Sequence, residues 1–309
     1  MCGVGDPLRI GFLPTNLQDL RHNSGFYPIC RVRPRHCYDD AMPRVAAIAE
    51  ISSAKHPLLK EIRLALRRGV RTKDGLLPLE TPHLLEEALD AGLPVETVLF
   101  TSALESQVMD RLRAKRVRPA LYRVRPDALR GASSTEAPPG LLALVRPRDW
   151  LAHDLFAPSP ALVVVLAGIQ DPGNAGTILR SAEAFGATGA LLLRGTVHPE
   201  NPKFVRAAAG SSFRLPHLAA VQLDQALALA AMHGAAIYAL DPRAARTLEQ
   251  VDLAKPCLLA VGAEGAGISP DLLEQATAVS VPRVRRVESL NAAVAAGLAL
   301  AEAARQRAK

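Results

Sequence analysis

Three polar loops hold the residues that could do chemistry in this 309-residue chain. They cover residues 168–176, 262–267 and 282–291, and each follows an apolar run that predicts a strand. Ligands of open α/β sheets bind at the carboxyl ends of the strands. Glycines in the first two loops permit positive φ and close approach of a ligand to the backbone. The loops are therefore candidate ligand-binding segments.

Glycine-rich turns alone indicate little, because many connections in α/β proteins contain them. Neither of the first two loops matches GxGxxG, and neither has the GK[ST] ending of a phosphate-binding P-loop. A Rossmann-type nucleotide enzyme, which also needs an acidic partner residue, is therefore poorly supported. The sequence shows no His/Cys cluster with metal-ligand spacing, so no metal is expected.

The third loop ends at the start of a predicted helix. Ser289 and Asn291 precede an alanine-rich run, and such side chains can accept hydrogen bonds from first-turn N–H groups. Upstream, a strand-like run ends at Val281 and Pro282, and the basic segment 283–286 follows. Ordinary capping explains Ser289 and Asn291, and a role in a site is compatible with it.

The elements that must position these loops form a strand–helix series. The continuous apolar run 161–167 suits a strand covered on both faces of a parallel sheet. Loop 168–176 leads into a helix predicted over 177–185. Further strands are predicted at 190–193, 236–240 and 257–261, and helices at 204–210 and 223–232. The series predicts a parallel α/β sheet.

A second compact α/β pattern precedes it, over residues 52–145. Its first helix should bury Leu58, Ile62, Ala65 and Leu66 and present a basic face made of Lys60, Arg63, Arg67 and Arg68. Strands are predicted at 75–80, 95–101, 121–124 and 141–145, with helices near 82–89 and 106–115.

The composition is that of a basic globular protein. The formal charge is +7 and hydrophobic residues make up 49%. A polyanionic partner such as RNA or DNA fits this charge slightly better than a merely solvated face does. Aromatic residues reach only 4%, which argues against a stacking platform for single strands. Four scattered cysteines, no apolar run of about 18 residues and no signal-peptide pattern favour the cytoplasm.

Changes in composition and hydrophobic pattern along the chain suggest four segments. Residues 1–41 are irregular, and two hypotheses compete for them: a flexible leader that contacts a polyanion, or an extension upstream of a biological start at Met42, which we favour. Residues 42–146 would form a first domain, 147–160 a linker, and 161–309 a second domain.

The three loops taken together are far more specific than any one. The runs NAGTILR at 174–180, VGAEGAGIS at 261–269 and VESLNAAVA at 287–295 resemble, in order and spacing, the three motifs of the SpoU (TrmH-like) RNA 2′-O-ribose methyltransferases of the SPOUT superfamily. Lys203, Arg206 and Gly210 also match that family's intervening segment. Residues 52–145 are similar to the ribosomal-protein-like RNA-binding domain that precedes the catalytic domain in many members.

The resemblance implies a SPOUT α/β catalytic domain with a C-terminal trefoil knot. It also implies a homodimer that binds S-adenosylmethionine (AdoMet) in the knot and methylates structured RNA, with ribosomal RNA favoured over transfer RNA. Carried residue by residue, it implies that AdoMet is held by Gly262, Ala263, Glu264, Gly265, Val281, Pro282, Ser289 and Leu290. The implied catalytic set is Asn174, Arg180, Glu264, Ser289 and Asn291. RNA would be bound by Lys60, Arg63, Arg67, Arg68, Lys203 and Arg206.

The chemistry of this reaction leaves two roles open for Arg180. A ribose hydroxyl is a poor nucleophile, so methyl transfer needs in-line placement and help with the proton. Family proposals make the arginine the proton acceptor, although arginine is normally fully protonated. Binding the adjacent phosphate and stabilising the developing alkoxide is at least as plausible.

One departure from the family pattern supports a rival hypothesis. Relatives commonly have Met and Gly in the loop after the proline, where this chain has Arg283 and Arg285. Since this loop lines the cofactor, the chain could instead be a catalytically impaired RNA-binding protein of the same fold. Titration with AdoMet discriminates between the two hypotheses.

Overall fold

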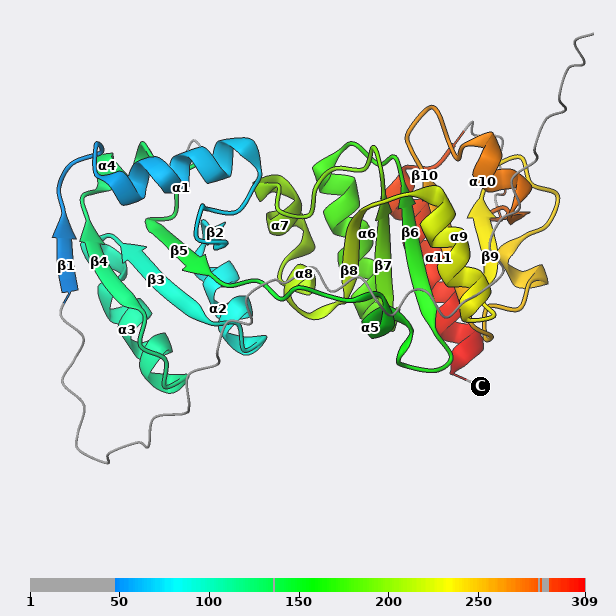
Figure 1. Cartoon of the computed structure of the whole chain (residues 1–309), viewed down its shortest axis with the longest axis horizontal. Helices are drawn as coiled ribbons and strands as arrows, with labels where there is room; N and C mark the ends of the chain where they lie inside the picture. The colour runs from blue at the N-terminus through cyan, green and yellow to red at the C-terminus, as the bar shows by residue number, and fades with distance from the viewer. Residues whose placement is uncertain (1–47, 136, 283, 285–288, 309) are drawn as a thin grey trace, which may run out of the picture. The chain divides into compact units, whose positions relative to one another are not determined.

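The computed structural model describes residues 48–308 apart from 136, 283 and 285–288. The segment 1–41, predicted to be irregular, therefore lies outside the described residues. So do Arg283 and Arg285, the two positions at which the loop after Pro282 differs from the family pattern. Residues 45–309 form one compact unit. Within it, two sheets are each flanked by helices (Figure 1).

The first sheet is mixed and has the strand order β1-β4-β3-β5-β2. Its parallel strands are β1 (Ile48–Ile51), β4 (Ala120–Val124) and β3 (Val95–Phe100). Strand β5 (Leu141–Val145) runs antiparallel to both of its neighbours, β3 and β2 (Leu77–Leu79). Its helices are α1 (Pro57–Arg68), α2 (Pro82–Asp90), α3 (Glu105–Ala114) and α4 (Pro126–Arg130), with a short 3₁₀ turn at Ser102–Leu104.

Helix α1 shows how closely periodicity predicts a buried face. It begins with proline in its first turn and ends at Gly69, which adopts the left-handed conformation typical of a helix stop. Its buried residues are Leu59, Ile62, Ala65 and Leu66. Leu58, predicted to point inward, is only half-buried, and Leu59 takes its place.

The second sheet is parallel throughout, as predicted, and has the order β11-β9-β10-β6-β7-β8. Its strands are β6 (Leu162–Ala167), β7 (Gly189–Leu193), β8 (His217–Val221), β9 (Ala236–Leu240), β10 (Cys257–Gly262) and β11 (Thr277–Val279). Strand β8 is an addition to the predicted series. The trefoil knot is a property of chain threading, which strand order and register do not test, so it stays a prediction.

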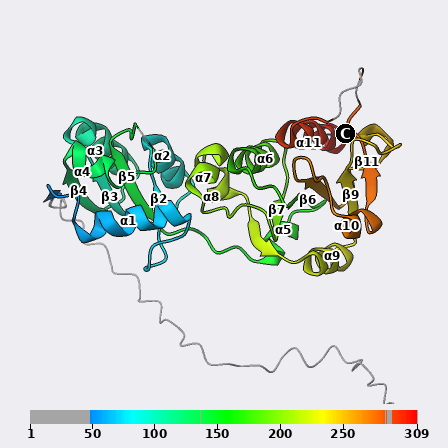
Figure 2. The ribbon, with the colours of Figure 1, turned by 90° about the horizontal axis from the view of Figure 1, so that it is seen from above.

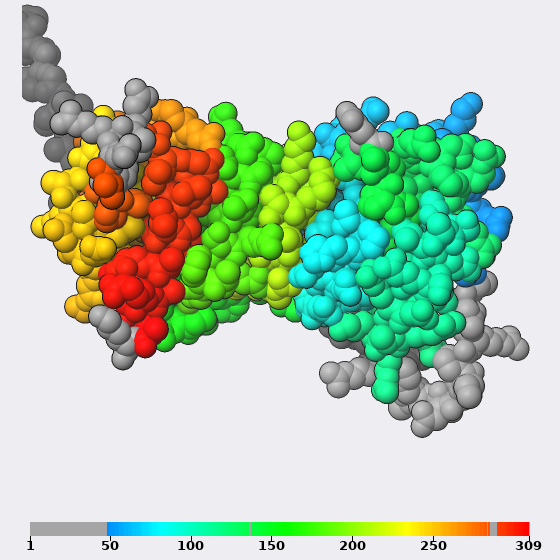
Figure 3. Space-filling model, turned by 180° about the vertical axis from the view of Figure 1, so that it is seen from behind, coloured from blue at the N-terminus to red at the C-terminus, as the bar shows by residue number. Residues whose placement is uncertain are grey.

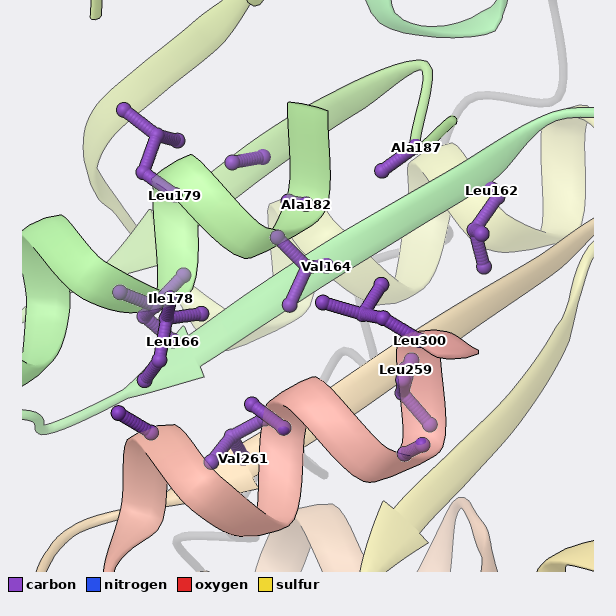
Figure 4. Packing of buried hydrophobic residues seen from close by; sticks show 14 of the residues in the cluster. Leu162, Val164, Leu166, Ile178, Leu179, Ala182, Ala187, Leu259, Val261 and Leu300 are labelled. Carbon is purple, nitrogen blue, oxygen red and sulfur yellow. The ribbon is translucent and has the colours of Figure 1, made fainter. Parts of the chain in front are cut away.

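Helices cover both faces of this sheet (Figure 2). Leu162, Val164 and Leu166 of β6 face α6 (Pro172–Ala184) and α11 (Ala292–Arg307), as Figure 4 shows. The alternate residues Val163 and Val165 face α5 (Ala152–Phe156), α9 (Leu223–Met232) and α10 (Pro270–Glu274). Figure 3 shows α11 in red beside the green segment that contains α6. The remaining helices are α7 (Pro202–Ala208), α8 (Ser211–Arg214) and a 3₁₀ turn at Leu248–Gln250.

Two of the predicted helices are corrected. Helix α6 begins at Pro172 rather than at 177, because Asp171 caps it and proline is tolerated in the first turn. The helix predicted over 204–210 ends at Ala208, where Ala209 and Gly210 both have positive φ and a new helix, α8, begins.

Three arginines join the two sheets' helices and loops within the compact unit. Arg206 of α7 donates to Glu80, which is only 2% exposed, with Nη1 2.6 Å from Oε2. Arg214 of α8 pairs with Glu183 of α6 and with Glu87 of α2, each at 2.6 Å. Burial alone would raise the pKa of Glu183, but hydrogen bonds from Arg214 and Ser211 outweigh it and hold this pKa below its ordinary value. Arg71 contacts Glu200 and Asp149.

Candidate functional site

The first loop places Asn174 in the first turn of α6. Asp171 caps this helix, its Oδ1 accepting a hydrogen bond from the Asn174 N–H at 2.7 Å. Because α6 follows directly on β6, the cap fixes the Asn174 side chain near the carboxyl end of that central strand.

The second loop is a tight turn at the end of β10. Ala263 and Gly267 exchange two backbone hydrogen bonds, of 3.1 and 2.8 Å, so that Glu264 lies at the tip. A Cβ on Gly262 would lie 2.3 Å from the Gly267 carbonyl carbon and 2.5 Å from the Ile268 nitrogen. Only glycine allows this turn to fold back so closely.

The third loop delivers Asn291 as the cap of α11, as the sequence predicts. Its Oδ1 accepts from the N–H groups of Ala293 and Val294, at 2.9 and 3.2 Å. This fixes the side chain with its Nδ2 group directed at the other two loops.

A hydrogen-bonded cluster of three side chains results. Asn291 Nδ2 lies 3.0 Å from Asn174 Oδ1 and 3.3 Å from Glu264 Oε1. Asn174 Nδ2 also donates to Glu264 Oε1. The Glu264 carboxylate thus accepts hydrogen bonds from both amides, and one cluster joins the ends of β6 and β10 to the start of α11.

A cavity of about 850 Å³ opens beside this cluster, which is within the range of about 300–1,000 Å³ typical of small-molecule sites. Of the eight residues predicted to hold a cofactor, the seven that line it are Gly262, Ala263, Glu264, Gly265, Val281, Ser289 and Leu290. Pro282 is exposed and does not line the cavity. Asn291 does line it, so the cluster forms part of the cavity wall.

Sequence reasoning missed one wall of the cavity, the segment Leu240–Arg243. Asp241 brings a carboxylate to it, and Arg243 lies beside that carboxylate, its Nε 3.4 Å from Oδ1. The sequence could have indicated this wall, because the segment follows the predicted strand 236–240 and ligands bind at the carboxyl ends of such strands. Apolar residues Ile268, Leu273 and Val279 complete the wall.

Arg180 lies apart from the cluster. It is exposed on α6, six residues beyond Asn174, which corresponds to about 9 Å along a helix. It does not line the cavity. Among the residues that the structure describes, it has no hydrogen-bond or ion-pair partner. The structure therefore brings together Asn174, Glu264 and Asn291, with Ser289 on the same cavity wall, and leaves Arg180 outside.

The cations predicted to bind RNA differ in availability. Four are exposed: Lys60, Arg67, Arg68 and Lys203. Arg63 is half-buried, with Nη2 3.4 Å from the Ala54 carbonyl oxygen. The Arg206 guanidinium is occupied by the buried Glu80 carboxylate.

Two further properties limit the range of sites. No group of three or more His, Cys, Asp or Glu residues that could hold a metal ion is found in the described part of the chain. None of the described helices is both long enough and apolar enough to span a membrane.

Comparison with known families matches two segments of the chain. Residues 161–301 match the SpoU rRNA Methylase family, and residues 56–143 match the MRM3-like substrate binding domain. An uncharacterized tRNA/rRNA methyltransferase of Synechocystis sp. is 37% identical over 270 residues, covering 86% of this chain and 97% of that protein. Another, from Mycobacterium tuberculosis, is 34% identical over 266 residues, covering 82% and 81%.

Solved structures show the same fold. The AdoMet-bound rRNA methyltransferase from Sinorhizobium meliloti has a TM-score of 0.73 at 27% identity, covering 84% of this chain and 98% of its own. The SpoU methyltransferase AviRb from Streptomyces viridochromogenes has a TM-score of 0.73 at 27% identity, covering 82% and 98%. A structure described as an RNA 2′-O ribose methyltransferase has a TM-score of 0.69 at 32% identity, covering 84% and 100%. With these matches and its parallel α/β sheet, the chain belongs to the SpoU family of RNA methyltransferases.

Proposed function

We propose that the chain transfers the methyl group of AdoMet to a ribose 2′-hydroxyl of structured RNA, ribosomal RNA ahead of transfer RNA, in the cytoplasm. The observation that carries the proposal is the cluster of Asn174, Glu264 and Asn291 on the wall of the 850 Å³ cavity. The solved relatives described as AdoMet-bound and as a ribose methyltransferase support both the cofactor and the position methylated.

The cavity fits AdoMet in the chemistry of its walls. Adenine has flat apolar faces, and Ile268, Leu273 and Val279 offer apolar side chains. The turn at Gly262 leaves backbone groups uncovered by a side chain. When bound, AdoMet supplies an electrophilic methyl group. Residues Gly262 to Gly265, with Val281, Ser289 and Leu290, would hold it.

The chain's own side chains would orient the RNA and manage its proton. The amides of Asn174 and Asn291 are fixed by helix starts and by Glu264, so they are preorganised to position a hydroxyl or its neighbours. Ser289, on the same wall, adds a hydroxyl. Arg180, a cation without a partner among the described residues, would bind the phosphate beside the target ribose or stabilise the alkoxide as it forms.

A homodimer would cover the surface on which Arg180 lies. Val294 and Leu298 of α11 are 51% and 47% exposed. Ser181, the neighbour of Arg180, lies 3.9 Å from the position that a Cβ on Gly297 would take, so α6 and α11 meet at this level. The proposed interface therefore combines an apolar strip on α11 with Arg180 on α6.

The two parts of the chain would divide the work. Residues 42–146, with the exposed basic face of α1, would hold the RNA. Residues 147–160 would connect this domain to residues 161–309, which would catalyse methyl transfer. Arg206 would contribute to RNA binding only by leaving Glu80, so Lys203 is the stronger candidate on α7.

Methyl transfer tests the proposal directly. The purified chain is incubated with tritiated AdoMet and total RNA from a strain that lacks it, and the RNA is digested to nucleosides. The label is expected in a 2′-O-methylnucleoside of ribosomal RNA. Label in a methylated base, or none in any RNA, would contradict the proposal.

A further inference from the structure

A second, smaller cavity of about 310 Å³ lies in the part of the chain built around the first sheet. Its lining residues follow the ends of β3 and β4, belong to α4, or precede β5. It is lined by Thr101, Pro126, Leu129, Arg130, Ala137, Pro138 and Gly140. Its volume is near the lower limit of small-molecule sites, so it suits a ligand smaller than a whole cofactor.

Thr101 gives this cavity a polar group without a partner. The residue is 8% exposed, and its Oγ1 forms no hydrogen bond with any of the described residues. Its backbone N–H donates to the Gly140 carbonyl oxygen at 3.0 Å, which fixes the residue in place. The hydroxyl is accessible from the open cavity, so it is available to pair with a ligand that enters there.

Gly140 keeps the Thr101 hydroxyl uncovered. It has a φ of 82°, and a Cβ there would lie 2.8 Å from Thr101 Oγ1. Any other residue would be strained and would crowd the hydroxyl. The loop before β5 therefore leaves the polar end of the cavity open.

The other walls have the chemistry of a base-binding site. The rings of Pro126 and Pro138 and the side chain of Leu129 are flat or apolar surfaces without charge. Arg130 is exposed at the cavity's edge. Ala54, in the turn that precedes the basic helix α1, lies 3.9 Å from where a Cβ on Gly131 would be. The cavity is thus next to the face that carries Lys60 and Arg63.

We infer that this cavity receives an unpaired nucleobase of the bound RNA. The Thr101 hydroxyl pairs with the edge of the base, the prolines and Leu129 contact its faces, and Arg130 meets a neighbouring phosphate. All seven lining residues fall inside the 56–143 match to a substrate binding domain. The inference rests on the proposed function in one respect, that the partner is RNA. Unpaired bases are also recognised by hydrogen bonds to their edges, so the aromatic content of 4% is compatible with such a site.

Binding of two RNAs to the full chain tests this inference. The probes are a fluorescein-labelled RNA hairpin with an unpaired loop of mixed sequence and a fully paired duplex of the same length. Thr101→Val removes the hydroxyl and keeps the shape, so hairpin affinity should fall about 2- to 10-fold while duplex affinity stays unchanged. Thr97→Val, on β3 but outside the cavity, is the matched control.

Two further variants separate filling of the cavity from charge. Ala137→Phe, at an exposed lining position, should block the cavity and weaken hairpin binding at least as much as Thr101→Val. Arg130→Ala should reduce the slope of log affinity against log salt by about 0.7, the value for one phosphate contact on a single strand. Arg113→Ala, an exposed arginine of α3 outside the cavity, should bind the hairpin like the parent chain.

The outcomes separate this inference from the proposed function. If the parent chain methylates RNA but Thr101→Val and Ala137→Phe bind the hairpin normally, the cavity is not a base site and the inference is overturned. An equal loss of hairpin and duplex affinity overturns it too. If Thr101→Val selectively lowers the affinity for the hairpin while the parent chain methylates no RNA, the cavity is supported as a base-binding site and the methyltransferase proposal fails.

Discussion

Asn291 uses the two ends of its side-chain amide for different tasks. The oxygen caps α11, and the nitrogen reaches Asn174 and Glu264. The sequence predicts the cap from residue type alone, and it also places the residue in a motif. It cannot show that one amide serves both, because the second partner lies 117 residues away in the chain.

Replacing Asn291 with Asp separates these tasks. The carboxylate still caps α11, so the free energy of unfolding should change by less than about 1 kcal/mol. The donor to Asn174 is lost, and a second negative charge faces Glu264. Methyl transfer should fall about 100-fold because the cluster no longer holds its geometry. Initial rates and thermal unfolding measure the two effects. Asn291→Ser also caps the helix and loses the donor but adds no charge, so comparing the two variants separates the lost hydrogen bond from the added charge. Normal transfer by Asn291→Asp would exclude the proposed orienting role.

Arg180→Ala should remove activity and leave the cofactor site intact. Arg180 does not line the 850 Å³ cavity, so the AdoMet dissociation constant should stay within about 2-fold of the parent value. Transfer to RNA should fall about 100- to 1,000-fold, as for loss of one charge-stabilising donor. Calorimetric titration and transfer rates measure each quantity. Arg180→Lys keeps the charge, so partial rescue would favour phosphate binding, and full activity of Arg180→Ala would refute any role.

Among the elements, the turn after β10 depends on a missing side chain. Gly262→Ala puts a Cβ 2.3 Å from the Gly267 carbonyl carbon, so the turn must open. AdoMet affinity should fall more than about 10-fold in calorimetric titration. Gly234→Asn is the control, because Gly234 does not line the cavity, a Cβ there would meet nothing within 4 Å, and Asn tolerates its positive φ. If the parent chain itself binds no AdoMet, the result favours the rival hypothesis of a catalytically impaired RNA-binding protein.

The ion pair between α6 and α8 should make stability depend on acid pH. The pKa of Glu183 is held low in the folded chain, so the pair stabilises the fold above the ordinary glutamate pKa of about 4.3. That contribution is lost as the pH falls through the lowered pKa. Glu183→Gln should therefore cost about 0.5–1 kcal/mol at pH 7, and this cost should shrink as the pH falls through the lowered pKa.

Denaturant titrations at several pH values measure this difference. Glu274→Gln, at an exposed position with no ion pair among the described residues, should show no such pH dependence. A cost for Glu183→Gln that does not shrink at any acid pH where the chain stays folded would show that the charge of Glu183 is not what stabilises the contact.

Several elements could not be placed from the sequence, for identifiable physical reasons. Pro172 and Gly173 suggested a loop, because both residues are common in turns, although proline also suits a helix start. Strand β8 is mostly half-buried at the sheet edge, so it lacks the continuous apolar run that identified β6. The wall from Leu240 to Arg243 was missed because it depends on β9 lying beside β10. Strand order of that kind is decided by packing across the sheet.

For the whole molecule, a second copy is the expected partner of the α6–α11 surface. Light scattering should give twice the 32.9 kDa mass of one chain. Leu298→Asp places a charge on the exposed strip and should yield monomers. Met232→Asp, on the exposed side of α9, is the control and should leave the dimer intact. A monomeric parent chain, or a dimeric Leu298→Asp variant, would contradict the proposed interface.

The order of these residues along the chain also sets the order in which the site can form during synthesis. Asn174 is made first and Glu264 later, and their common partner Asn291 and α11 follow both. Until then, the apolar side of α6 with Ile178 and Leu179 has no α11 to cover it, and nascent chains in that state are prone to aggregate. A chain that stops short of α11 would lose both the reactive cluster and its own protection, so a truncated product could neither act nor persist.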